Sequence, residues 1–471
     1  MIERVGELAL VDGFDSLIAG SGVANGSAAP GGASAVIQAI VSPLPALWES
    51  SDEQNLLRKA VLSVVTKVIA VGSNDAVAAL MGSVILPLLT VATNPARPEA
   101  IYLMEDGLEL WQAVLRRAPV VGFPAELSAL FPNIATTLEQ DFDFLRPAMF
   151  IVEAYVLTGG ADFVHAHGAA LAALFARVAG NVKPKAAQYV AKALEAVLRK
   201  VPRDGAQLLL SAGVLSTLVS AGLKSAAGAR DAEPDFAVVL HLTVLARVLL
   251  TAPDIFGALG VAFAAAQQPA ASPLAARALL IQLVDLWLDK FDAVGYSSAG
   301  PWRRKLWALS LVSLLGSGAV EMSNASARLM GAAPHPHPDD ELLSRLDQIL
   351  NVCIDVLSEL ESDVGPTGSP CAAHYLPQRA ASDDELAHPG GASADDGDGR
   401  QRDPFVALER TEMLSDVVHT TDLRAFLMTQ MQQCASLVGP NRYQAALAAV
   451  EPAMLQHLNP SSRPPPSPPP K

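Results

Sequence analysis

The sequence predicts an all-α fold, and three properties of its composition support that prediction. Of its 471 residues, 51% are apolar, and only 5% are aromatic. An apolar fraction of this size argues against global disorder. The low aromatic content argues against β-sandwiches and barrels, whose strands favour aromatic and β-branched side chains. The abundant alanine and leucine are instead among the strongest helix formers.

From residue 51 onward, apolar residues recur at helical spacing between short breaks rich in Pro, Gly, Asn and Asp. The breaks include Gly72-Ser73-Asn74-Asp75 and Asn94-Pro95. In chain order, the predicted helices cover residues 52–71, 76–92, 99–117, 123–138, 146–158, 162–179, 185–201, 205–223, 236–250, 254–266, 273–291 and 302–315. A loop over 323–338 and helices over 339–361, 423–437 and 442–458 complete the pattern.

The spacing of these helices predicts a repeat architecture. Taken in pairs, they begin near residues 52, 99, 146, 185, 236 and 273. Two helices every 37–51 residues is typical of HEAT or armadillo arrays. In such arrays each unit buries its apolar face against its neighbours. Three separate domains would need longer polar linkers than residues 51–315 contain. We therefore expect an α-solenoid, a superhelical array of HEAT/armadillo-type helical repeats.

The expected organisation along the chain has five parts. Residues 1–50 form a partial first repeat with a Gly/Ala/Ser-rich insertion at 20–35, and residues 51–361 form the HEAT-repeat solenoid. Residues 362–410 are expected to be an acidic disordered loop, because they combine Gly, Pro and Ser with Asp and Glu. C-terminal helices over 411–458 and a Pro-rich disordered tail over 459–471 follow. Met1 lies inside an amphipathic pattern without a preceding N-cap residue, as in a truncated gene product or a fragment.

The charge balance narrows the partners that we expect. Thirty-three basic and 48 acidic residues give a net charge of −15. Direct nucleic-acid binding is disfavoured, because neutralising phosphates requires a surplus of Lys and Arg. Basic protein partners are favoured instead. Three cysteines, Cys353, Cys371 and Cys434, are too few for a disulfide framework and fit a reducing compartment.

The mean hydropathy of +0.31 raises the question of membrane insertion. Residues 76–96, 205–223 and 255–276 are uncharged windows long enough for a span of roughly 20 residues. Each window is interrupted by Pro, Gln or small polar residues, and the flanks lack the Lys/Arg asymmetry of inserted helices. Helices that are apolar on most faces also occur buried between neighbours. We expect no stable membrane insertion.

No motif in the sequence indicates catalysis, a cofactor or a metal. The glycines at 20, 22 and 26 miss the G-x-G-x-x-G spacing of a dinucleotide loop. His335-Pro336-His337 and Cys371-x-x-His374 lack the second pair of ligands that a zinc site needs. His165 and His167 lie two positions apart on a helix and point to different sides. We expect no enzyme, no cofactor and no catalytic, cofactor-binding or metal residues, and the sequence leaves the protein-binding residues unknown.

The segment Ile101-Tyr102-Leu103-Met104-Glu105-Asp106-Gly107-Leu108-Glu109-Leu110-Trp111 carries the most specific signal. Further segments match the same protein family in the same order, at residues 1–5, 47–48, 55–58, 286–290, 303–306 and 416–420. This ordered set resembles the C-terminal half of the importin-11-like receptors in the karyopherin-β (importin-β) family. At 416–417 the chain has Asp-Val where the family segment has Asp-Pro.

The resemblance implies a stack of HEAT repeats and a nuclear import receptor. Such a receptor binds protein cargo, here expected to be basic. It passes the nuclear pore through contacts with pore proteins, shuttles between nucleus and cytoplasm, and releases cargo when Ran-GTP binds. The principal Ran-binding repeats of the family lie N-terminal to the matched region. Ran-GTP binding is therefore expected of the full-length receptor rather than of this chain.

The resemblance assigns no binding residue, because the matched segments are structural. Trp111 and Trp287 are expected to be core anchors rather than ligand contacts, and Glu105-Asp106 and Asp289-Lys290 to be ridge residues that cap helices or pair between them. The alternative function is a HEAT-repeat scaffold for an enzyme or regulatory complex.

Overall fold

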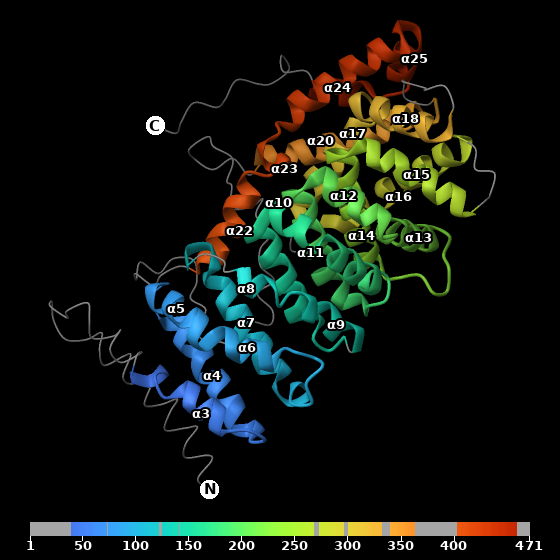
Figure 1. Ribbon diagram of the computed structural model, residues 1–471. Helices are drawn as coiled ribbons and strands as arrows, with labels where there is room; N and C mark the ends of the chain where they lie inside the picture. Colours follow the sequence, from blue (N-terminus) through green and yellow to red (C-terminus); the bar gives the residue numbers. More distant parts are fainter. Residues whose placement is uncertain are drawn as a thin grey trace, which may run out of the picture. The chain divides into compact units, whose positions relative to one another are not determined.

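The computed structural model describes residues 39–72, 74–121, 125–140, 142–267, 273–295, 300–331, 340–362 and 403–458 (Figure 1). Within these ranges every regular element is a helix, and none is a strand. The all-α prediction is confirmed. The insertion at 20–35, residues 363–402, the tail from 459, and the residues 1–5 of the family resemblance lie outside the described ranges.

The chain divides into two compact units. One unit comprises Met1–Gly159 with Arg402–Leu408, and the other comprises Gly160–Gln401 with Glu409–Lys471. The division falls inside α10 (Leu145–Val178), where the two helices expected at 146–158 and 162–179 meet at a kink. Gly160 interrupts this helix with φ 56° and ψ −142°, a conformation that essentially only glycine adopts.

The first unit contains both short and long helices. They are α3 (Leu44–Ser50), α4 (Asn55–Val71), α5 (Asn74–Leu80), α6 (Leu86–Ala92), α7 (Ala100–Val121), α8 (Ala125–Ser128), α9 (Pro132–Gln140) and the first half of α10. A π-helical turn, Met81–Ile85, separates α5 from α6 where one helix was expected over 76–92. Pro87 explains it, since proline removes a backbone donor and its ring clashes with the carbonyl group four residues earlier.

The helices α4 and α7 run parallel, as the corresponding helices of successive repeats do. Near their beginnings, Lys59 forms an ion pair with Asp106 at 3.3 Å. Near their ends, the Arg117 guanidinium donates to the carbonyl oxygens of Ile69, Ala70 and Gly72 at 2.8–3.3 Å. These bonds join residues 45–48 positions apart, within the predicted repeat spacing.

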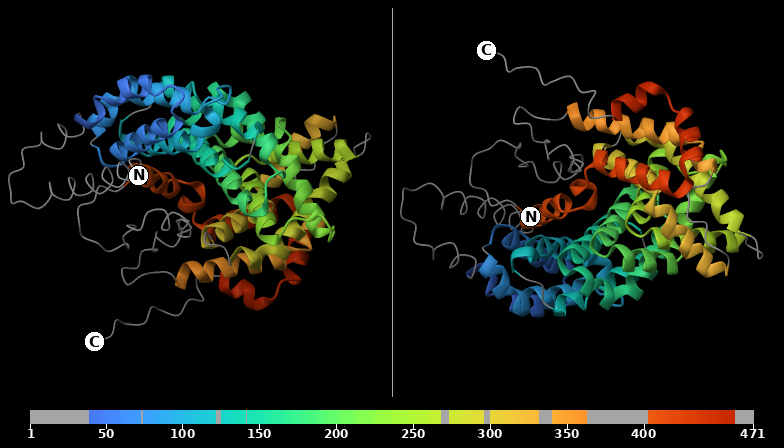
Figure 2. Two further views of the ribbon diagram at one scale, coloured as in Figure 1. Left: turned by 90° about the horizontal axis from the view of Figure 1, so that it is seen from below. Right: turned by 90° about the horizontal axis from the view of Figure 1, so that it is seen from above.

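The second unit contains the remaining helices (Figure 2). They are the second half of α10, α11 (Ala187–Lys200), α12 (Pro202–Ser211), α13 (Val214–Ala226), α14 (Asp235–Thr251), α15 (Pro253–Gln267), α16 (Pro273–Gly295), α17 (Gly300–Ser313), α18 (Ser317–Met330), α19 (Asp340–Leu343), α20 (Leu346–Ser362), the last turns of α22 (Pro404–Leu414), α23 (Val417–Thr420), α24 (Leu423–Val438), α25 (Pro440–Ala448) and α26 (Pro452–Leu458). Its centre is α14, where each residue from Ala237 to Leu249 is buried. The helix α24 packs against α17 and α20.

Three predicted boundaries in this part of the chain are wrong. The helix expected over 205–223 is two helices, α12 and α13, because Gly213 adopts a left-handed conformation with φ 74° between them. The loop expected over 323–338 contains most of α18, whose buried residues are mainly alanines. The acidic loop expected to continue to 410 gives way to α22 at Pro404, where the Asp403 carboxylate accepts the backbone N–H of Phe405 at 2.9 Å.

Two helical segments, Asn74–Ala92 and Leu145–Val178, are long and apolar enough to cross a membrane by length and composition. In their most apolar windows, 44% and 61% of the residues are buried inside the protein. Two bent pairs, Pro202–Ser211 with Val214–Ala226 and Pro301–Ser313 with Ser317–Met330, pass the same test together. Helix packing therefore accounts for much of the apolar sequence, and the absence of membrane insertion stays a prediction.

Candidate functional site

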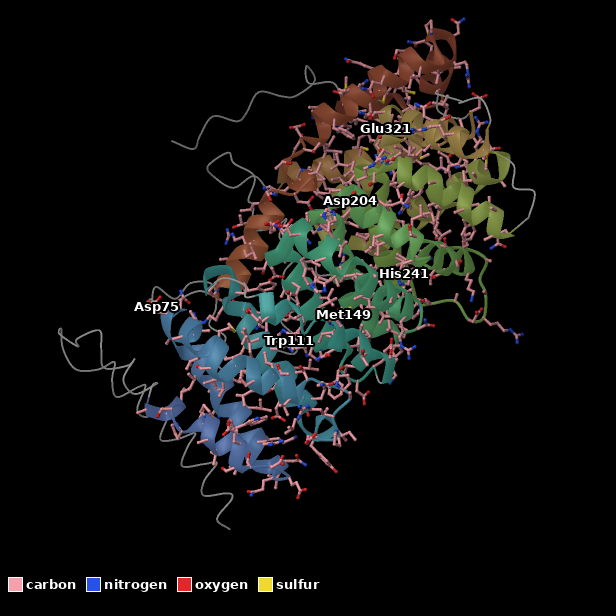
Figure 3. The ribbon with its side chains drawn as sticks, viewed as in Figure 1. Asp75, Trp111, Met149, Asp204, His241 and Glu321 are labelled. Carbon is pink, nitrogen blue, oxygen red and sulfur yellow. The ribbon has the colours of Figure 1, made fainter. Side chains whose placement is uncertain are left out.

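The two tryptophans of the resembling segments are core residues, as expected. Trp111 and Trp287 are 0% and 1% exposed, and Trp111 lies among the helices of the first unit (Figure 3). The Trp111 indole N–H donates to the Tyr155 hydroxyl at 3.0 Å, and that hydroxyl donates to the Leu127 carbonyl oxygen at 2.7 Å. Burial raises the pKa of Tyr155, so the hydroxyl remains protonated. The Trp287 indole donates to the Leu242 carbonyl oxygen at 3.1 Å.

The charged residues beside these tryptophans pair between helices, which confirms that prediction for Asp106 and Lys290. Asp106 on α7 pairs with Lys59 on α4. Lys290 on α16 lies 3.1 Å from the Asp235 carboxylate on α14 and 3.3 Å from Asp289. The hydrogen bond to Asp235 raises the pKa of Lys290. These contacts stabilise helix stacking and do not form a binding site.

The outer face of α7 presents apolar and acidic side chains together. Its inner face is occupied by buried residues at helical spacing, Leu103, Met104, Leu108 and Trp111. That spacing turns Ile101, Glu105 and Glu109 to the opposite side, where they are exposed. Ile101 is 83% exposed and Tyr102 is 57% exposed.

The beginning of α4 adds a third exposed apolar residue to this face. Leu56 is 73% exposed, and the parallel stacking of α4 on α7 places the first turns of both helices together. We call the group of Leu56, Ile101, Tyr102, Glu105 and Glu109 the α4–α7 surface. Large apolar side chains grouped on a surface are typical of protein-interaction sites, and the carboxylates beside them complement basic residues. The α4–α7 surface is therefore the candidate protein-binding site of the first unit.

The α4–α7 surface is not among the features predicted from the sequence, although the sequence contains a signal for it. Ile101 and Tyr102 stand on the charged side of an otherwise amphipathic helix, which is an unusual position for large apolar residues. Leu56 is added to the surface by the packing of α4 on α7, which no local pattern reveals.

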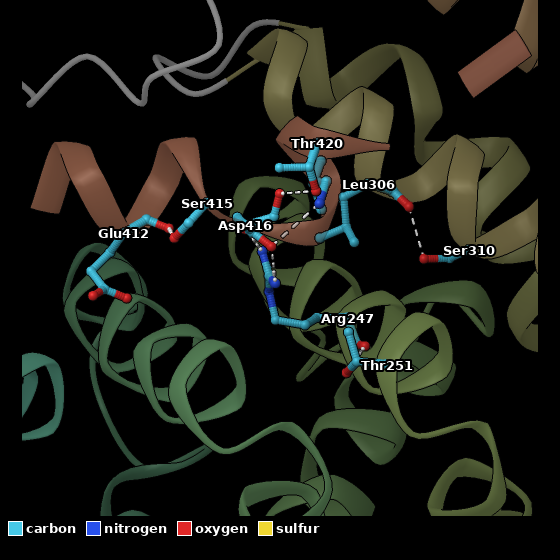
Figure 4. Close-up of polar contacts among 9 residues, drawn as sticks. Arg247, Thr251, Leu306, Ser310, Glu412, Ser415, Asp416 and Thr420 are labelled. Carbon is cyan, nitrogen blue, oxygen red and sulfur yellow. Dashed lines mark hydrogen bonds and ion pairs between the residues drawn. The ribbon is translucent and has the colours of Figure 1, made fainter. Parts of the chain in front are cut away.

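A buried ion pair anchors the C-terminal helices of the second unit (Figure 4). The Arg247 guanidinium on α14 donates to both Asp416 carboxylate oxygens, at 3.0 and 2.7 Å, and both side chains are 1% exposed. Asp416 also caps α23 by accepting the Val418 N–H at 3.3 Å. Burial opposes ionisation of this carboxyl, but the charge and hydrogen bonds of Arg247 hold its pKa below the ordinary value. The Trp302 ring lies under the guanidinium at 5.1 Å.

Metal and thiol chemistry find no support in the described part of the chain. Among those residues, no group of three or more His, Cys, Asp or Glu side chains is placed to hold a metal ion. The motifs at 20–26, 335–337 and 371–374 lie outside the described residues. Exposed His165 pairs with Asp204 at 3.0 Å, whereas the His167 ring lies 4.8 Å from that of Phe163. Cys353 and Cys434 are buried free thiols, and burial raises the pKa of Cys434 to about 11.

Comparison with known proteins gives one consistent result. Residues 59–462 match a family model described as "Importin-11-like, TPR repeats". Importin-11 from Homo sapiens is 25% identical over 427 residues, which cover 89% of this chain and 38% of that protein. Importin beta-like protein kap113 from Schizosaccharomyces pombe is 23% identical over 421 residues, which cover 89% and 37%. The chain thus spans about 38% of the length of the first curated relative.

The solved structure of Lph2, described as a bidirectional nuclear transport receptor in S. cerevisiae, has the same fold. Its TM-score is 0.66 at 17% identity, and the match covers 89% of this chain and 40% of that one. The family description names TPR repeats, which are also built from two helices. The hydrogen bonds between successive repeats, which span 44–48 residues, fit the longer HEAT or armadillo period.

Proposed function

The chain belongs to the importin-11-like family, and from that premise we propose that it forms part of a karyopherin, a receptor that imports protein cargo into the nucleus. The observation that carries the proposal is the family match over residues 59–462, which includes helices of both units. The named relatives are importins. The receptor shuttles between nucleus and cytoplasm and contacts nuclear pore proteins during passage.

The part played by this chain is cargo binding. The α4–α7 surface offers exposed apolar side chains next to carboxylates, which suits a cargo segment that combines basic and apolar residues. The net charge of −15 increases the rate at which a basic cargo encounters the protein. The role requires no cofactor and no catalytic residue.

Release of cargo is assigned to Ran-GTP acting on the full-length receptor. To test this, the receptor is loaded with a labelled basic cargo and then mixed with Ran-GTP or, as the control, with Ran-GDP. Ran-GTP is expected to release the cargo and Ran-GDP to leave it bound. Equal retention with both nucleotides, together with stable recovery of catalytic subunits, would favour the alternative of a static HEAT-repeat scaffold.

A further inference from the structure

The segment from Arg177 to Arg203 has the opposite charge to the chain as a whole. It contains seven basic residues and one acidic residue, Glu195, which is buried. The net charge of the full chain is −15. The basic residues are Arg177, Lys183, Lys185, Lys192, Arg199, Lys200 and Arg203. The second unit therefore contains a local basic surface at α11 and its two ends.

The helix α11 places part of this charge on its outer side. Its apolar residues, among them Val190, Leu194, Val197 and Leu198, are buried. The side chains of Lys192 and Lys200 remain 47% and 22% exposed. The two lysines are about two helical turns apart and share one side of α11, and Arg199 adjoins Lys200. We call Lys192, Arg199 and Lys200 the α11 basic face.

The end of α22 occupies the α11 basic face. The Lys192 ammonium donates to Glu409 at 2.8 Å, and the Lys200 ammonium donates to Glu412 at 2.7 Å. The positive charge of Arg199 helps to lower the pKa of Asp416. Glu409 and Glu412 lie three residues apart on one side of α22, and Asp416 follows this helix as the N-cap of α23. The α11 basic face thus already binds an acidic helical ligand, supplied by the same chain.

The occupying helix buries fewer residues than α24, the next long helix of the chain. Phe405 is the buried residue of α22, whereas α24 buries Leu423, Leu427, Gln430, Met431, Cys434 and Val438. Val406 of α22 is 38% exposed. Solvent reaches the Lys192–Glu409 pair through the lysine, which is 47% exposed, whereas Lys200 and Glu412 are only 22% and 19% exposed. An ion pair open to solvent contributes little and is screened by salt. Asp416 differs from these two acids, because its pairing with Arg247 is fully buried.

We propose that the α11 basic face is a docking site for an acidic helix of a partner protein, and that α22 occupies the site until the partner displaces it. The partner helix carries carboxylates three to four residues apart, as Glu409 and Glu412 are. This site lies apart from the α4–α7 surface, has the opposite charge, and does not depend on nuclear transport. A protein helix is favoured over a nucleic acid because the remaining chain is strongly acidic and repels extended polyanions.

The test uses the full chain and a fluorescent peptide with the sequence of residues 404–416. The double variant Glu409→Gln/Glu412→Gln weakens the internal ligand, so we expect it to bind this peptide about tenfold more tightly than the natural chain. Adding Lys192→Gln and Lys200→Gln is expected to reverse the gain, and 0.5 M salt to abolish the binding, because the contacts are charged. As a matched control, Asp231→Asn breaks the exposed Lys224–Asp231 pair elsewhere in the same unit and should leave peptide affinity unchanged.

Several results would overturn the proposal. The proposal fails if the double variant binds the peptide no more tightly than the natural chain does, or if its gain in affinity survives the two lysine substitutions. It also fails if the chain binds a single-stranded oligonucleotide more tightly than the peptide. Because the assay contains neither cargo nor nuclear pores, its outcome is independent of the transport function.

Discussion

Arg247 and Asp416 form an ion pair enclosed from solvent, although 169 residues separate them in the sequence. The guanidinium binds both carboxylate oxygens, and the same carboxylate caps the helix that follows it. One contact therefore joins the C-terminal helices to α14, the most deeply buried helix of the second unit.

Removing one partner of this pair should be strongly destabilising. Asp416→Asn leaves a buried guanidinium without its counter-charge, and we expect a loss of about 3–5 kcal/mol in the free energy of unfolding. Urea unfolding followed by tryptophan fluorescence measures it. Asp231→Asn removes an exposed pair and should cost less than about 1 kcal/mol. Equal losses in the two variants would show that the buried pair has no special role.

The tyrosine hydroxyl that links Trp111 to Leu127 gives a second prediction. Tyr155→Phe leaves a buried indole N–H unpaired and removes one of the two hydrogen bonds to the Leu127 carbonyl oxygen, which should cost about 1–3 kcal/mol. Tyr102→Phe is the matched control on the same unit, because Tyr102 is 57% exposed and its substitution should stay within about 0.5 kcal/mol of the natural chain. Thermal unfolding of both variants tests the difference. Indistinguishable melting curves would refute it.

Two glycines on α15 should respond differently to alanine. A Cβ atom at Gly257 would lie 2.6 Å from the Met322 carbonyl oxygen on α18, so Gly257→Ala should force the helices apart and cost about 1–3 kcal/mol. At Gly260 the nearest atom is the Ala276 Cβ at 3.6 Å. Gly260→Ala should therefore be neutral or stabilise the helix by up to about 1 kcal/mol. Thermal unfolding of both variants tests this prediction, because Gly260→Ala should have the higher melting temperature. The prediction fails if Gly257→Ala is the more stable variant.

A buried histidine should make stability fall with acid. Burial lowers the pKa of His241 to about 4, although the Glu233 carboxylate lies 3.6 Å from its Nδ1 atom. The unfolded chain, with an ordinary histidine pKa near 6.5, then takes up this proton first as the pH falls. The contribution of neutral His241 to the free energy of unfolding is present above pH 6.5 and is lost progressively towards pH 4. At pH 5.5 the loss is about 1.4 kcal/mol. His241→Leu should remove that part of the dependence when unfolding is compared at pH 7.5 and 5.5. If the stability of His241→Leu depends on pH as that of the natural chain does, the effect does not come from His241.

Acidic residues on the α4–α7 surface should control cargo affinity. Glu105→Lys with Glu109→Lys places positive charge where a basic segment would bind, and we expect at least about a tenfold loss of affinity for a basic cargo peptide. Glu321→Lys, on α18 of the second unit, changes the net charge without touching this surface. Fluorescence anisotropy of the labelled peptide separates the local effect from the global one. Equal losses in both variants would exclude the α4–α7 surface as the site.

The sequence predicts those helices whose boundaries are set locally. The helix expected at 236–250 is α14, Asp235–Thr251, because its apolar run ends at Pro residues on both sides. In contrast, α18 has an alanine-rich buried face, and its burial depends on the close approach of Gly257 from another helix. Arg247 could not be matched to Asp416 from sequence, because no periodic pattern connects residues so far apart. The same limit applies to the packing of α4 on α7, on which the α4–α7 surface depends.

The most direct test of the central claim is entry of the chain into the nuclei of permeabilised cells. The chain is fused to a fluorescent protein and compared with an inert fluorescent fusion of the same size, too large to diffuse freely through the pore. A nuclear transport receptor should collect at the nuclear rim and enter the nuclei faster than the inert fusion. If the chain stays outside to the same extent as the inert fusion, with no signal at the rim, the claim is contradicted.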